Sequence, residues 1–226
     1  MRKHENGNAV VIILITVALF AGLTFTLSNS TRDGGETSGL SVAQAELHAT
    51  QIMTYAAEAE SVIDQMVFNG TFIEAIDEIL PSDAAFETGS DIDKLFHPDG
   101  GGLTYKTATE PPFVMVSPAP TTQSSWVLSD ITNVEWSDTT ASDIILTAFG
   151  IAQPVCQAIN NAITGATTIP VLGAGDAGYP DDAFAEDSGG ADLLIAECAE
   201  CEGQNALCVS NSSADRWYYY SVIGAQ

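Results

Sequence analysis

Four cysteines are the residues of this chain whose types and spacing most restrict their chemistry: Cys156, Cys198, Cys201 and Cys208. An even number of cysteines in an exported domain indicates disulfides, and three pairings of four cysteines exist. We favour a Cys156–Cys208 bond that closes the domain and a short Cys198–Cys201 loop. A bond from Cys198 or Cys201 to Cys208 would instead fasten a C-terminal hairpin.

Metal and redox chemistry compete with disulfides at the Cys198-x-x-Cys201 pair, whose spacing fits half a zinc site. Cys208 follows too closely to supply the usual second pair, and the chain has only three histidines, at His4, His48 and His97. A redox-active pair would need a thioredoxin-like context, which the flanking sequence lacks. Flanking acids would also oppose thiolate formation at this pair; they are Glu197, Glu200 and Glu202.

The acidic, glycine-containing segment 173–194 is a candidate calcium-binding site, and calcium is the one cofactor that we consider for this chain. Calcium takes about six to eight oxygen ligands, and carboxylates in a glycine-rich loop can supply them. The candidate ligands are Asp176, Asp181, Asp182 and Asp187. Their spacing does not match an EF-hand, and a solvated acidic loop without any metal is the alternative.

No motif indicates an enzyme, because the chain lacks G-x-S-x-G, H-E-x-x-H and P-loop patterns. With 30 acidic residues, almost any two carboxylates could be proposed as the catalytic pair of a glycosidase, so such a pair gives no evidence for that activity. His97 stands in FHPDGGG, residues 96–102, which is a turn sequence and could alternatively let backbone approach a ligand closely. We therefore expect a protein without catalytic activity.

The charge is divided unevenly along the chain, which has 226 residues and a net charge of -24. Residues 1–33 hold three basic and two acidic residues, whereas residues 34–226 hold 3 basic and 28 acidic residues. Such an acidic chain is a poor nucleic-acid binder, because phosphate binding requires clustered Lys and Arg. We expect no nucleic acid among the partners.

The apolar residues are concentrated in Ala9–Leu27, nineteen residues without a charge. A helix of this length spans about 28 Å, close to the hydrocarbon core of a bilayer. Arg2 and Lys3 favour a cytoplasmic N-terminus, with the rest of the chain across the inner membrane in the periplasm or outside the cell. A secretory signal cleaved near Ser28 and Ser30, a plain anchor and a prepilin-type segment are the three interpretations.

The leader MRKHENG, residues 1–7, is short, basic and ends in glycine directly before the apolar run. It resembles the leader of type IV pilins and type II secretion pseudopilins, which is cut after the glycine, here between Gly7 and Asn8. Major pilins usually carry glutamate at the fifth mature position, where this chain has Ile12. That departure favours a minor or tip subunit. The resemblance also supplies a family analogue for calcium, since some major pseudopilins carry a calcium loop in their C-terminal region.

The resemblance implies an α+β fold in which one long helix, transmembrane and then amphipathic, leads into an antiparallel head. We divide the chain into leader 1–7, transmembrane helix 8–28, hinge 29–39, stalk 40–80 and acidic head 81–226. In the stalk we predict a helix over 40–68, because apolar residues recur on one helical face: Ile52, Ala56, Ala59, Ile63 and Met66. We expect Asn69-Gly70 to end this helix. A second helix, capped by Thr71, is predicted over 72–80. In the head we predict strands at 103–107, 113–117, 125–129, 133–136, 143–149, 207–210 and 216–224, and a helix at 150–163 that begins near Pro154.

Further strings, FHPDGGG, CQAIN at 156–160 and the aromatic C-terminal strand, resemble pilin-like envelope proteins of Gram-negative bacteria. Together these features predict a pilin-like or pseudopilin-like subunit with a structural role, whose partners are the inner membrane and other pilin-like subunits or an assembly platform. The alternative is a monomeric, single-pass periplasmic binding protein with no filament role.

Overall fold

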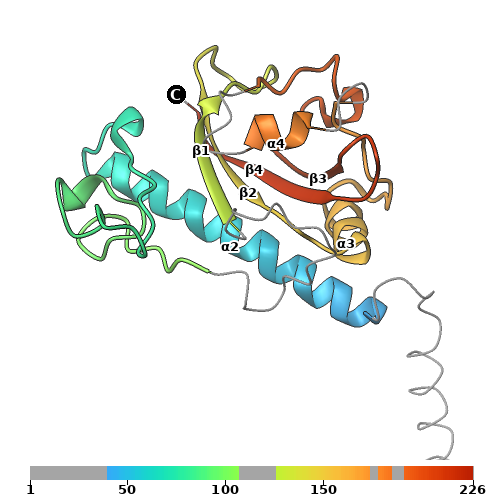
Figure 1. Cartoon of the computed structure of the whole chain (residues 1–226), viewed down its shortest axis with the longest axis horizontal. Coiled ribbons are helices and arrows are strands. Elements are labelled where there is room, and N and C mark those ends of the chain that lie inside the picture. The colour runs from blue at the N-terminus through green and yellow to red at the C-terminus, as the bar shows by residue number, and fades with distance from the viewer. Residues whose placement is uncertain (1–39, 107–125, 174–177, 185–190, 226) are drawn as a thin grey trace, which may run out of the picture. The chain divides into compact units, whose positions relative to one another are not determined.

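The computed structural model describes residues 40–106, 126–173, 178–184 and 191–225 (Figure 1). The chain forms two compact units, Met1–Gln44 and Ala45–Gln226, and the sheet and its core belong to the second unit. The leader, the cleavage residues Gly7 and Asn8, the apolar run and the hinge lie outside the described residues. Among the helices that are described, none is both long and apolar enough to span a bilayer.

Helix α2, Val42–Phe68, is 27 residues long and confirms the helix predicted from apolar spacing. It begins with a capping box, in which the Ser41 amide donates to Gln44 Oε1 at 3.0 Å and the Gln44 amide donates to Ser41 Oγ at 3.3 Å. Its buried side chains recur every three or four residues and so form one face; they are Ala45, Ala49, Ile52, Tyr55, Ala56, Ala59, Ile63 and Met66.

The end of α2 is a Schellman motif. The Thr71 amide donates to the Met66 carbonyl at 3.0 Å, and the Gly70 amide donates to the Val67 carbonyl at 3.0 Å. Gly70 has a φ of 104°, which glycine adopts without the penalty that a side chain would bring. The Asn69-Gly70 stop predicted from the sequence is therefore confirmed.

Four antiparallel strands form one sheet in the order β1-β2-β4-β3. The strands are β1 (Trp126–Thr132), β2 (Asp143–Ala148), β3 (Ala206–Ser210) and β4 (Trp217–Ala225). The register places Trp126, Ala148, Tyr219 and Cys208 in one row across all four strands. Since neighbouring residues along a strand point to opposite faces, the next row puts Val127, Thr147, Tyr220 and Leu207 on the other face.

Helices cover both faces of this sheet (Figure 1). On one face the Tyr55 ring of α2 lies 4.7 Å from the Trp126 ring, and α3 (Gln153–Thr164) packs against β3. On the other face the short α4 (Tyr179–Phe184) stacks Phe184 on Tyr220, with ring centroids 5.7 Å apart. The predicted fold class, α+β with a long helix on an antiparallel sheet, is confirmed. Cover on both faces explains why all six residues of β2 are buried.

Several local predictions are wrong. Residues 72–80 form one 3-10 turn, Ile73–Ala75, that Thr71 does not cap, because the backbone beyond it pairs with another segment. The Asp77 amide donates to the Asp93 carbonyl at 2.7 Å, and the Leu95 amide donates to the Asp77 carbonyl at 2.9 Å. The described residues 103–106 form no strand, and residues 133–136 contribute only an isolated bridge at Val134.

Other local predictions hold or remain untested. The helix predicted over 150–163 is α3, which begins at Gln153 with Pro154 in its first turn, where the missing proline N–H costs nothing. The strands predicted around 125–129, 143–149, 207–210 and 216–224 correspond to β1, β2, β3 and β4. Helix α4 stands where the sequence predicted a loop. The strand predicted at 113–117 lies outside the described residues.

Candidate functional site

A buried lysine organises the loop around FHPDGGG. The Lys94 side chain is only 1% exposed. Its ammonium donates to the carbonyls of Phe86 and Thr88, both at 2.6 Å, to that of Ala85 at 3.3 Å, and to Asp91 Oδ1 at 2.8 Å. Four oxygen acceptors satisfy the buried charge, which would otherwise be very costly to desolvate. We call this arrangement the Lys94 cage.

His97, Asp91 and Asp99 form the one group among the described residues whose ligand atoms could surround a metal ion, all lying within 4.8 Å of one another. Two of the three candidate ligands, His97 Nδ1 and Asp91 Oδ1, already have partners within the protein. The Asp99 amide donates to His97 Nδ1 at 3.2 Å, so a neutral imidazole carries its proton on Nε2, which faces Asp91 Oδ1 at 3.9 Å. Asp91 also accepts from Lys94, and this hydrogen bond lowers the pKa of the Asp91 carboxyl. The lysine ammonium therefore supplies the positive charge that a metal would supply.

The glycines of FHPDGGG serve close packing. A Cβ on Gly100 would lie 2.3 Å from the Lys94 carbonyl oxygen, and one on Gly101 would lie 2.4 Å from the Leu95 carbonyl oxygen and 2.8 Å from Val62 Cγ1 of α2. The Gly100 and Gly102 amides both donate to the His97 carbonyl, at 2.9 and 2.8 Å. The motif is thus a tight turn pressed against the lysine cage and α2, which agrees with the turn interpretation.

The two disulfides join Cys156 to Cys208 and Cys198 to Cys201, the pairing favoured from the sequence. Cys156–Cys208 ties α3 to β3, and Asn160 reinforces that tie, because its amide group donates to the Cys208 carbonyl and accepts from the Cys208 amide, both at 2.8 Å. Cys198 and Cys201 are buried in the core on the α4 face of the sheet. A buried disulfide packed among apolar side chains is a structural bond, and disulfides indicate an oxidising, extracytoplasmic location.

Of the four carboxylates considered for calcium, Asp176 and Asp187 lie outside the described residues, whereas Asp181 and Asp182 lie in the first turn of α4. Both oxygens of Asp181 are engaged: Oδ2 accepts from Arg216 Nη1 at 2.7 Å and Oδ1 accepts from the Tyr218 hydroxyl at 3.0 Å. Asp181 therefore already has a cationic partner in Arg216, and its hydrogen bond from Tyr218 fastens α4 to β4. Calcium binding at this segment stays a prediction.

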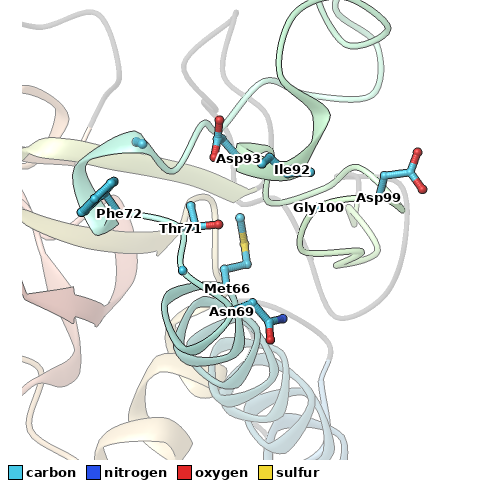
Figure 2. A pocket seen from close by; sticks show the side chains of 10 residues that line it. Met66, Asn69, Thr71, Phe72, Ile92, Asp93, Asp99 and Gly100 are labelled. Carbon is cyan, nitrogen blue, oxygen red and sulfur yellow. The ribbon is translucent and has the colours of Figure 1, made fainter.

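A pocket of about 490 Å³ opens between the end of α2 and the loop that contains the Lys94 cage (Figure 2). Its lining includes Met66, Thr71, Phe72, Ile92, Asp93 and Asp99. Figure 2 shows Met66 rising from α2 toward the loop that carries Asp93 and Ile92, with Phe72 at one edge of the pocket and Asp99 at the opposite edge, its carboxylate directed outward. We call it the acidic-apolar pocket.

Two of the apolar side chains of this pocket are unusually exposed: Phe72 is 77% exposed and Ile92 is 63% exposed. Phe68, on the last turn of α2, is 90% exposed. Exposed apolar side chains scattered singly are ordinary, but their concentration around a hollow is typical of a binding surface. Sequence reasoning missed both this pocket and Lys94. The scarcity of cations in the head was the signal that could have singled out Lys94.

No protein-family model, no curated protein and no solved structure was found to match this chain. Function is therefore inferred from the sequence together with the geometry of the described residues. That geometry includes a long helix on an antiparallel sheet, two disulfides, and an acidic-apolar pocket at the end of the helix.

Proposed function

We propose that this chain is a pilin-like, membrane-anchored subunit of a type IV filament or secretion assembly, with a structural role. The observation that carries the proposal is α2, whose buried face packs on a four-stranded antiparallel sheet. This helix follows the apolar run Ala9–Leu27 in the sequence, as the stalk of a pilin-like protein follows its membrane segment.

In this proposal the apolar N-terminal segment holds the subunit in the inner membrane, and the head lies in the periplasm or outside the cell. The two disulfides support that location, since such bonds persist in oxidising compartments. Assembly would bring the apolar segments of neighbouring subunits together, and the heads would form the surface or the tip. Ile12, where major pilins usually have glutamate, favours a minor or tip position.

N-terminal sequencing of the mature protein tests the proposal. A mature chain that starts at Asn8 supports prepilin processing, and Gly7→Val is then expected to leave the precursor uncut. A chain that keeps Met1 contradicts the proposal, and a start at Thr31 identifies a cleaved secretory signal.

A monomeric, membrane-anchored binding protein is the second candidate, and the acidic-apolar pocket favours it. Its volume of about 490 Å³ lies within the range of small-molecule sites. Crosslinking in intact cells separates the two functions. A filament or secretion subunit is expected to give crosslinks to other membrane-anchored subunits, whereas the binding protein gives monomers only.

A further inference from the structure

The acidic-apolar pocket combines exposed apolar side chains with carboxylates. Phe72 and Ile92 present apolar side chains that are 77% and 63% exposed. Asp93 and Asp99 also line the pocket: Figure 2 shows Asp93 beside Ile92 and Asp99 at the edge opposite Phe72, with its carboxylate directed outward. A complementary segment would therefore carry an apolar side chain to enter the pocket and cations to meet its carboxylates.

The cations of a second copy are poorly placed to fill this role. The head, residues 34–226, has three basic residues, and each is engaged inside its own molecule. Lys94 is enclosed in its cage, Lys106 Nζ lies 4.5 Å from the centre of the Tyr55 ring, and Arg216 pairs with Asp181 at 2.7 Å. Against 28 acidic residues, a head-to-head contact between copies would place like charges together.

We propose that the acidic-apolar pocket docks a basic segment of a different protein, with an aromatic or aliphatic side chain against Phe72 and Ile92 and with Lys or Arg beside Asp93 and Asp99. The inference rests on the proposed assembly function, because it names the chemistry of the subunit's partner. Its test does not involve N-terminal processing, so the two proposals can fail separately.

The test uses the full chain in mild detergent and, as the probe, a random peptide library displayed on phage. Peptides that bind are expected to be rich in Lys or Arg and to contain Trp, Phe or Leu. Phe72→Ser should weaken their binding about tenfold, as loss of an interface anchor does. The double variant Asp93→Asn with Asp99→Asn should weaken binding about threefold, and rising salt should weaken it further.

Matched variants distinguish binding at the pocket from non-specific hydrophobic or electrostatic binding elsewhere on the surface. Leu47→Ser removes an apolar side chain that is 57% exposed elsewhere on α2, and Glu200→Gln with Glu202→Gln removes two exposed carboxylates outside the pocket. Both are expected to leave binding of the selected peptides unchanged. Because Phe72 is 77% exposed, Phe72→Ser should leave the melting temperature unchanged, so that a loss of binding is not a loss of folding.

Three results would overturn the inference. The first is a selection that yields no binders, or only binders that lack basic residues. The second is binding that Leu47→Ser weakens as much as Phe72→Ser does. The third is self-association of the full chain that Phe72→Ser abolishes, because the occupant of the pocket would then be a second copy.

Discussion

The two disulfides close loops of very different length, and this difference sets their expected contributions to stability. Cys156 and Cys208 are separated by 52 positions, whereas Cys198 and Cys201 are separated by 3. A crosslink that reduces the chain entropy of the unfolded state contributes about 4 kcal/mol for the longer separation and about 1.6 kcal/mol for the shorter one. Replacing each pair by alanine should therefore destabilise the head by amounts that differ by about 2.5 kcal/mol.

The two alanine pairs are controls for each other. Every one of the four cysteines is at most 3% exposed, so each double variant removes two buried sulfur atoms and leaves a similar cavity. The comparison isolates the effect of loop length. Urea unfolding of the full chain in mild detergent, followed by tryptophan fluorescence, should give a lower midpoint for Cys156→Ala with Cys208→Ala. Its melting temperature should be about 5–10 °C below that of the other pair.

Equal losses of stability in the two variants, or a larger loss for the Cys198 and Cys201 pair, would refute the loop-length reasoning. Asn160 provides a further check, because it bonds to both backbone groups of Cys208. If this amide already holds α3 on β3, Asn160→Ala should cost more stability in the disulfide-free background than in the intact protein. A double-mutant cycle measures that coupling.

Three further perturbations test the site and its surroundings. Lys94→Met should reduce the free energy of unfolding by about 3–5 kcal/mol, because it leaves buried carbonyls without a donor. The control Lys106→Met makes the same charge change and should cost about 1 kcal/mol or less. Urea titrations of both variants measure the difference. Gly101→Ala should reduce the free energy of unfolding by about 1–3 kcal/mol, because the added Cβ meets the Leu95 carbonyl and the Val62 side chain of α2. The Cβ added by Gly70→Ala meets no atom within 4 Å, so this variant should lose only the positive-φ penalty of about 1–2 kcal/mol. Thermal melts compare the two variants. Burial raises the pKa of the Asp143 carboxyl in the folded state, so the contribution of this group to folding stability is present at low pH and is lost as the pH rises through the raised pKa. The stability of Asp143→Asn relative to the wild type should therefore increase with pH. Urea midpoints measured from acid to neutral pH test this.

The elements predicted correctly are those whose signal is local. The buried face of α2 repeats every three or four residues, and the apolar run of β2 and the aromatic run of β4 have strand composition and length. The elements predicted wrongly depend on distant partners. Residues 72–80 give up a helix because Asp77 pairs with Asp93 and Leu95. Helix α4 forms within an acidic segment because Phe184 stacks on Tyr220 and Asp181 binds Arg216.

The candidate site was less predictable than the fold for the same reason. Nothing beside Lys94 in the sequence shows that the carbonyls of Phe86 and Thr88 will turn inward to meet it. Likewise, Phe72 and Ile92 look like core residues in the sequence, and only the turn at Gly70 and the packing of the loop leave them on the surface. The spacing of the four cysteines is compatible with three pairings, and the packing of α3 on β3 brings Cys156 to Cys208.

The engaged cations of the head have a consequence for how the proposed subunit would assemble. Two like charges at 4 Å repel by about 1 kcal/mol in water, and screening at physiological salt acts beyond about 8 Å. Heads of identical copies would therefore add repulsion at each close contact, with no free basic side chain in the head to offset it. A different neighbour that brings basic residues removes this cost. If the proposed pilin-like function holds, Ile12, in place of the glutamate usual in major pilins, favours the same arrangement, in which the subunit joins other proteins rather than a run of its own copies.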